Sequence, residues 1–222
     1  MAPGTPDGTP RQAIAIGITG ASGAIYATRT LAALLERGIH VELIVSDYGR
    51  RLLRDELGET ATIENLLPFL ASKYGGDISA GTINLHSNRD LGATIASGSH
   101  GCSGMAIVPC SMKTLAAVAH GLSRNLIERA ADVMLKERRR LVLVPRETPI
   151  SAIHLENMLK LAHAGAVILP PSPGFYDHPT TVADLVDFVV ARVLDQLAVP
   201  NQLGPRWGED RLNAPLPGTQ SI

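Results

Sequence analysis

A glycine-rich turn near the amino end has the residue types that hold a phosphate. The stretch "AIAIGITGASGAIYATRTL", residues 13–31, has the pattern of an apolar strand, a tight turn and a helix. Gly20 and Ala21 let the backbone approach a ligand, and Ser22 adds a hydroxyl. The helix offers free N–H groups at the positive end of its dipole. A tight turn without a ligand remains the alternative, because glycines alone are a weak indication of a site.

Two familiar nucleotide-binding patterns fit this turn poorly. Its spacing is not G-x-G-x-x-G, and Tyr26 stands where a short-chain dehydrogenase has its last glycine. Asp47 could reach a ribose, but no tyrosine has a lysine four residues later, as the catalytic pair of that class requires. No Gly-Lys-Ser/Thr follows the turn, so it is not a Walker P-loop. An NAD(P)-dependent dehydrogenase is therefore disfavoured.

Polar side chains follow each of the later predicted strands at the point where the strand ends. They are Ser46 after the second strand, Ser111 and Thr114 after the third, Arg146 and Glu147 after the fourth, and Tyr176 after the fifth. The carboxyl ends of parallel strands share one edge of a sheet, where ligands bind. Any one of these residues could be a helix cap or a solvated loop residue. Together they predict a pocket for an anionic, planar cofactor.

Two predicted helices carry cations that could bind a second phosphate. Arg129, Asp132 and Lys136 share one face of the helix at 125–137. The simpler alternative is a solvated face on which Arg129 pairs with Asp132. Arg192 lies beside the apolar stripe of the last helix, where a buried stem would place its charged head in a cleft. A purely structural arginine is the alternative at that position.

Metal-dependent and cysteine-based sites are not indicated. The sequence has no C-x-x-C or H-E-x-x-H, and its seven histidines are scattered. Cys102 and Cys110 are too few for a disulfide scaffold, and no histidine forms a nucleophile pattern with Cys110. The net charge of −1 gives no overall field for nucleic acid or an anionic membrane, so a basic cluster would serve a local anion.

The elements that must position these residues are short apolar strands alternating with amphipathic helices. The expected strands are 13–19, 40–46, 105–110, 141–145 and 166–170. Later helices are expected at 125–137, 151–165 and 181–198, the last of them opened by Thr181 with Asp184 in its first turn. This alternation predicts a three-layer α/β fold, Rossmann-like or flavodoxin-like, with a parallel sheet covered on both faces. Residues 57–104 are less regular and could hold a short helix, a loop over a site or an oligomer contact. The polar start, and the lack of any apolar run of about 18 residues, predict a cytoplasmic protein without a membrane span.

Seven stretches resemble, in order and spacing, the UbiX-like flavin prenyltransferases across residues 12–208. They are "GITGASGAIY", "ASGS", "PCSMKTL", "NLIERAADVMLKERR", "LVLVPRETP", "HLENMLKLAHAGAVILPPSPGFY" and "VDFVVARVLDQL". The resemblance implies that FMN and dimethylallyl monophosphate bind to a homo-oligomer, typically a dodecamer. A dimethylallyl group is joined to reduced FMN, phosphate leaves, and the prenylated FMN activates UbiD-type decarboxylases, including one in ubiquinone synthesis. Residues 1–11 are then a disordered tail, 12–200 the flavoprotein domain, and 201–222 an extension that contacts a neighbouring subunit.

The resemblance also implies roles for individual residues. FMN would contact Gly20, Ala21, Ser22, Ser46, Ser111, Met112, Lys113, Thr114 and Arg146, with only backbone roles for Met112 and Lys113. The prenyl donor would contact Ala96, Ser97, Arg129, Lys136, Glu147, Tyr176, Arg192 and Trp207. Ser22 and Glu56 would move the proton that is lost on ring closure. Glu147 would protonate the leaving phosphate or orient the arginines. Arg129 and Lys136 would neutralise the charge that grows on that phosphate.

These cations would replace the metal ion that many prenyltransferases use, because the chain has no Asp-rich motif. Two alternatives stay open. A flavin-dependent cysteine decarboxylase is disfavoured because "PCSMKTLAAV" stands where that class has P-x-M-N-x-x-M. A flavin-binding carrier without enzymatic activity would not need Glu147 or the cationic residues.

Overall fold

The structure is a computed structural model that describes residues 13–176 and 178–204. Its centre is one parallel sheet of six strands in the order β3-β2-β1-β4-β5-β6. The strands are β1 (Ala13–Ile18), β2 (His40–Val45), β3 (Thr82–Ser87), β4 (Cys102–Cys110), β5 (Arg140–Pro145) and β6 (Val167–Ile168). The predicted parallel α/β fold is therefore confirmed. The expected tail at 1–11, Trp207 and most of the expected C-terminal extension lie outside the described residues.

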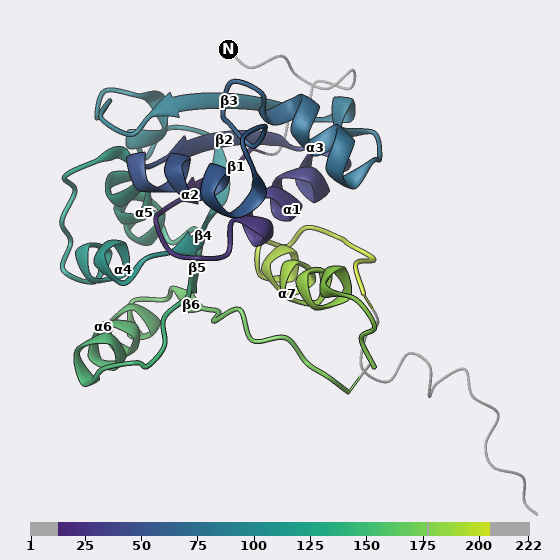
Figure 1. The fold of residues 1–222 in the computed structure, drawn as a ribbon. Helices are drawn as coiled ribbons and strands as arrows, with labels where there is room; N and C mark the ends of the chain where they lie inside the picture. The colour runs from purple at the N-terminus through teal and green to yellow at the C-terminus, as the bar shows by residue number, and fades with distance from the viewer. Residues whose placement is uncertain (1–12, 177, 205–222) are drawn as a thin grey trace, which may run out of the picture.

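Helices cover both faces of the sheet (Figure 1). They are α1 (Ala24–Leu35), α2 (Asp47–Leu57), α3 (Leu66–Tyr74), α4 (Met112–Ala119), α5 (Leu126–Lys136), α6 (Ala152–His163) and α7 (Val182–Gln196). Buried side chains of α1, α3 and α7 pack on one face, and those of α4, α5 and α6 pack on the other. Every residue of β1 is buried between the two layers, which explains its unbroken apolar sequence. None of the helices in the described residues is long and apolar enough to cross a membrane.

The expectation of five strands was wrong by one. The region without a clear pattern contains α3, β3 and two short 3-10 helices, η1 (Ile78–Ala80) and η2 (Thr94–Ala96). β3 lies at the edge of the sheet, and none of its residues is fully buried, so it lacks the apolar run of the central strands. The strand expected at 166–170 is reduced to β6, and β4 begins at Cys102 rather than at residue 105.

The start of α7 follows the prediction closely. The Thr181 hydroxyl accepts a hydrogen bond from the Asp184 amide at 3.2 Å, and the Asp184 carboxylate accepts one from the Thr181 amide at 2.8 Å. This reciprocal capping box satisfies two amides that the helix itself cannot pair. The segment between β6 and α7 thereby ends at a defined point on the α1 side of the sheet (Figure 1).

Candidate functional site

The sheet changes winding direction between β1 and β4, which are neighbours although β2 and β3 come between them in sequence. Ligands of open α/β sheets bind at such a point, outside the carboxyl ends of the strands. Thr19 joins the two loops here. Its buried hydroxyl donates to the Pro109 carbonyl at 2.8 Å and accepts from the Ser111 amide at 2.7 Å. The two loops are thus held in register at the place where a ligand would bind.

A cavity of about 430 Å³ opens at this junction. It is lined by Thr19, Gly20, Ser46, Asp47, Tyr48, Asn88, Ser111, Lys113, Thr114, Asn125 and Glu128. Gly20, Ser46, Ser111, Lys113 and Thr114 are among the residues expected at a flavin. The cavity therefore brings residues from three separate strand ends to one place.

Two helices begin at this cavity with unpaired amides. The Ser46 hydroxyl accepts from the Gly49 amide at 3.0 Å, and the Ser111 hydroxyl accepts from the Thr114 amide at 3.3 Å. Both serines are helix caps, as the simpler interpretation expected, and both line the cavity. Across residues 13–176 and 178–204, the first-turn amides of these helices without a hydrogen-bond partner are those of Asp47, Tyr48, Met112 and Lys113. Such amides, at the positive ends of two helix dipoles, suit a phosphate.

The beginning of α1, where the sequence suggested free amides for a phosphate, is already occupied. The Glu56 carboxylate of α2 accepts from the Gly23 amide at 3.0 and 3.2 Å and from the Ala24 amide at 2.7 Å. A carboxylate is stabilised at a helix amino end for the same reason as a phosphate. Of the N–H groups expected to be free at this helix end, those of Gly23 and Ala24 are therefore already bound. Glu56 instead stands at the glycine turn, bonded to Gly23, the residue that follows Ser22.

The beginning of α5 is also closed, by a residue that sequence reasoning missed. Asn88 accepts from the Leu126 amide through its backbone carbonyl at 2.9 Å and from the Ile127 amide through its side chain at 3.1 Å. Asn88 follows β3, and because β3 was not recognised, no signal pointed to it. The helix amino ends that offer unpaired amides to a phosphate at this cavity are therefore those of α2 and α4.

Close packing makes glycine necessary at position 20. A Cβ atom there would lie 2.5 Å from the Cβ of Tyr48, which is closer than real Cβ contacts allow. The turn also meets the end of β5, where the Arg146 guanidinium donates to the Ser22 carbonyl at 3.4 Å. Glu147 accepts from the Thr148 amide at 3.1 Å. Residues from the ends of β1, β2 and β5 thus surround the glycine turn.

The cations of α5 lie near the segment that precedes β4. The Arg129 guanidinium donates to the Ala96 carbonyl at 3.2 Å, and a Cβ at Gly98 would lie 2.8 Å from the Lys136 ammonium. The structure therefore brings Ala96, Ser97, Arg129 and Lys136 into one neighbourhood. Lys136 ends α5, about 16 Å along the helix from the end that borders the cavity, at about 1.5 Å per residue over 11 residues.

Each of these cations already has an acidic partner in its own sequence neighbourhood. Arg129 pairs with Asp132 at 2.8 Å, as the solvated-face alternative expects, and Lys136 pairs with Glu137. Arg129 and Lys136 keep about a third and nearly half of their side-chain surface exposed, at 35% and 45%. An incoming phosphate would compete with these carboxylates or share the cations with them.

Tyr176 and Arg192 lie on the other side of the sheet. Tyr176 packs edge-on against Phe188 of α7, with ring centroids 5.9 Å apart, and Arg192 pairs with Asp195 at 2.9 Å. Helix α5, which carries Arg129 and Lys136, packs on one face of the sheet, and α7, which carries Arg192 and the Phe188 that Tyr176 contacts, packs on the other (Figure 1). One chain therefore does not gather all of the expected donor-binding residues.

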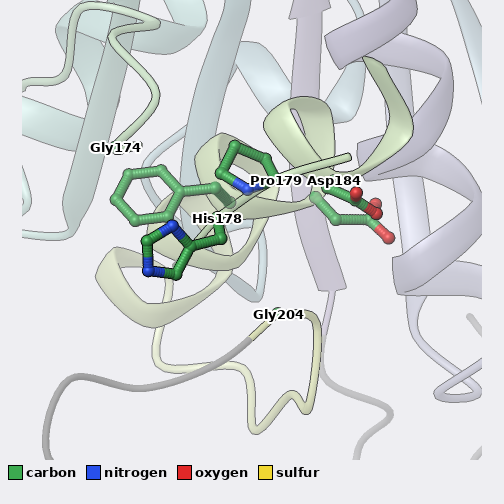
Figure 2. Close-up of a pocket in the computed structure, with 7 residues that line it drawn as sticks. Gly174, His178, Pro179, Asp184 and Gly204 are labelled. Carbon is green, nitrogen blue, oxygen red and sulfur yellow. The ribbon is translucent and has the colours of Figure 1, made fainter. Parts of the chain in front are cut away.

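A smaller hollow of about 180 Å³ lies beside the segment that carries Tyr176. Figure 2 shows His178, Pro179 and Asp184 along the stretch that leads into α7. Asp187 lines the same hollow and pairs with Arg29 of α1 at 2.6 Å. This ion pair links α7 to α1 and fixes the Asp187 side of the hollow.

Cysteine chemistry and a metal centre find no support in the described part of the chain. Burial raises the pKa of Cys110 to about 12 and also raises that of Cys102, which keeps both thiols protonated and unreactive. Within residues 13–176 and 178–204, no group of three or more His, Cys, Asp or Glu side chains has the geometry to hold a metal ion.

Comparison with known proteins shows the family of this chain. Residues 5–194 match the Flavoprotein family. The flavin prenyltransferase UbiX of Pseudomonas aeruginosa is 50% identical over 201 residues, which cover 90% of this chain and 95% of the relative. A crystal structure of AnUbiX (PadA1) in complex with FMN and dimethylallyl pyrophosphate is 41% identical with a TM-score of 0.79, covering 89% of this chain and 97% of that one.

A dodecameric FMN-dependent UbiX-like decarboxylase from Escherichia coli O157:H7 is 42% identical with a TM-score of 0.78, covering 88% of this chain and 99% of that one. The family match over residues 5–194 includes both the glycine turn and the cationic helices. The chain belongs to the Flavoprotein family and, within it, to the UbiX-like flavin prenyltransferases.

Proposed function

We propose that this protein joins the dimethylallyl group of dimethylallyl monophosphate to reduced FMN and supplies the prenylated FMN to UbiD-type decarboxylases. The observation that carries the proposal is the cavity between β1 and β4, where the close-packed glycine turn meets the unpaired amides of α2 and α4. The complex of AnUbiX with FMN and dimethylallyl pyrophosphate supports the same pair of ligands for this chain.

The residues present at the cavity fit FMN. The unpaired amides of Met112 and Lys113, with the neighbouring Ser111 and Thr114 hydroxyls, would hold the FMN phosphate. The turn at Gly20 brings bare backbone to the cavity wall, where a flat ring system can lie against it. When bound and reduced, the flavin supplies the electron-rich ring atoms that become joined to the dimethylallyl group.

The chain's own charged residues would make phosphate a sufficiently good leaving group. Cleavage of the allylic C–O bond places negative charge on the departing phosphate, and fixed cations stabilise that charge as it develops. Arg129, Lys136 and Arg192 would supply the positive charge, and Glu147 would give a proton to the phosphate. Glu56, held by the Gly23 and Ala24 amides, would accept the proton lost on ring closure, with Ser22 relaying it.

A complete donor site would need more than one copy of the chain. Arg129 and Lys136 lie in one helix layer and Arg192 in the other, so a neighbouring chain would bring the two sets together. Helix α6 presents a surface for such a contact, because Ile153, Leu155 and Leu159 are 68%, 55% and 57% exposed. We propose a homo-oligomer, with the dodecamer of the E. coli relative as its expected form.

The proposed location is the cytoplasm, which is supported by two cysteines that remain free thiols. The reaction is tested by incubating the purified protein with reduced FMN and dimethylallyl monophosphate and weighing the released flavin. The expected protein is yellow, binds FMN without a covalent link, and releases a flavin heavier by one dimethylallyl-derived unit. Unchanged flavin mass with tight FMN binding would instead indicate a carrier.

The shared site is tested by mixing two inactive variants. Lys136→Ala and Arg192→Ala chains, unfolded and refolded together, would form oligomers in which some sites receive neither defect. Prenylation activity is expected to return in the mixture and not in either variant refolded alone. A mixture that stays inactive, although mass spectrometry shows mixed oligomers, would place both residues in a site built by one chain.

A further inference from the structure

A buried carboxylate outside the candidate site is surrounded by three histidines. Glu42 of β2 has a side chain only 3% exposed. Its carboxylate lies 2.6 Å from Nε2 of His86, 3.0 Å from Nε2 of His100 and 3.3 Å from Nε2 of His40. Asn84 donates to the same carboxylate at 2.9 Å. These contacts join β2, the edge strand β3 and the segment before β4.

The partners keep this buried carboxylate ionised. Burial alone would raise the pKa of Glu42, but hydrogen bonds from His86 and Asn84 and the charge of His86 and His100 outweigh it, so that pKa lies below its usual range. An ionised carboxylate in the interior is tolerated only with such partners. Removal of its charge would therefore weaken its contacts with the three histidines and Asn84.

One of these groups belongs to the segment that carries the expected donor-binding serine. His100 lies in the connecting segment, residues 97–101, which runs from η2 to β4. Arg139 donates to the Gly98 carbonyl at 2.7 Å and to the His100 carbonyl at 2.8 Å. Gly98 passes so close to Lys136 and Glu137 that a side chain there would clash. The connecting segment is thus held between Glu42 on one side and the cations around the end of α5 on the other.

We propose that Glu42 is a positioning residue for the prenyl donor and acts through His100. The inference rests on the proposed function, which places Ser97 and Lys136 at the donor phosphate. Glu42 itself does not touch Ser97 or Lys136, but the His100 ring that it holds fixes the connecting segment beside the Lys136 ammonium. Without that contact, the segment would be restrained from the α5 side alone.

The test compares Glu42→Gln and His100→Gln with two exposed controls, Glu59→Gln and His163→Gln. We expect each cluster variant to raise the KM for dimethylallyl monophosphate by about 2- to 30-fold, the range of indirect couplings. The kcat at saturating donor and the affinity for FMN should stay unchanged.

A double variant and amide hydrogen exchange make the test decisive. The Glu42→Gln/His100→Gln protein should be no worse than the more affected single variant, and exchange in residues 97–101 should speed up in both singles without FMN or donor. The proposal would be overturned by a donor KM that stays unchanged in folded variants. Additive effects of the two substitutions on the donor KM, or a parallel loss of FMN affinity, would overturn it as well. If Glu42→Gln does not fold, His100→Gln decides, since that side chain is 24% exposed. Lack of prenylation by the wild-type protein would instead overturn the proposed function, and the exchange measurement would still report on the cluster.

Discussion

The two halves of the candidate site are built in different ways. The cavity at the flavin side is assembled within one chain from backbone amides, small residues and helix caps, and its central tie, Thr19, is 2% exposed. The donor side consists of long cationic side chains that lie on both faces of the sheet, and the Arg192 side chain is 55% exposed. The flavin side is therefore preorganised by the fold, whereas the donor side, as we propose it, would need a second chain.

The reason lies in the groups that each half uses. Amides at a helix end are fixed by the backbone and keep their direction when a ligand arrives. Lysine and arginine side chains lose considerable conformational freedom when they are ordered, and here each one is held by an acidic neighbour. Substitutions should therefore separate the two halves clearly.

The largest expected effect is on the donor side. Lys136→Ala and Arg192→Ala each remove a charge-assisted contact to phosphate, worth about 1.5–3 kcal/mol, or roughly a 10- to 150-fold loss in turnover or donor affinity. FMN affinity should stay nearly unchanged, because neither residue lines the cavity between β1 and β4. Activity is assayed over a range of donor concentrations beside an FMN titration.

Arg51→Ala is the matched control, because Arg51 is 71% exposed and pairs along its own helix with Asp55. It should leave both measurements unchanged. A collapse of FMN binding in Lys136→Ala or Arg192→Ala, with normal donor dependence, would assign these residues to the flavin side or to the core.

A substitution on the flavin side should change FMN binding and leave donor dependence unchanged. Gly20→Ala would place a Cβ 2.5 Å from the Tyr48 Cβ, and the turn must shift to relieve this overlap. Overpacking of this kind costs about 1–3 kcal/mol, which predicts FMN binding weaker by about 5- to 150-fold. The donor KM at saturating FMN should change little.

Gly101→Ala serves as the control for FMN binding, because a Cβ there meets no atom within 4 Å. Isothermal titration with FMN compares the two proteins. Equal FMN affinity in Gly20→Ala and Gly101→Ala would show that the close approach at the glycine turn plays no part in flavin binding.

A smaller effect should appear in stability at high pH. The buried Cys110 thiol has a pKa of about 12 in the folded chain against 9.0 for an ordinary cysteine, so the folded chain keeps a proton that the unfolded chain loses above pH 9. Its contribution to the free energy of unfolding is complete below about pH 9 and falls by up to about 1.4 kcal/mol per pH unit above it. Urea unfolding of wild-type protein and Cys110→Ala at several pH values measures the difference in slope, and identical slopes would place this thiol in contact with solvent.

The smallest expected effect is that of a chelator. If Arg129, Lys136 and Arg192 neutralise the leaving phosphate, prenylation should proceed at an unchanged rate in excess EDTA. Activity that disappears with EDTA and returns with Mg²⁺ would show that the cations do not suffice. The donor side would then resemble that of metal-dependent prenyltransferases.

Local patterns predicted most of the units that build the site. The turn after β1, the serines that begin α2 and α4, and the cap at Thr181 each depend on neighbouring residues, and all are found where they were expected. β3 escaped notice because an edge strand buries little and needs no apolar run. Because β3 was not predicted, the role of Asn88, which follows it, was also missed. The same holds for His86 and His100, which reach Glu42 only when β3 pairs with β2 and the chain returns to β4.

The sequence by itself determined the α/β class, the family and the residue types at each strand end, because these follow from short-range periodicity and turn chemistry. Only the tertiary structure decided which helix ends stay open to a ligand. Glu56 lies 32 residues after Ala24, the first residue of α1, and no local pattern states that this carboxylate binds the first amides of that helix. The same holds for the division of the donor residues between two faces, since the face on which a helix packs depends on how the chain crosses the sheet.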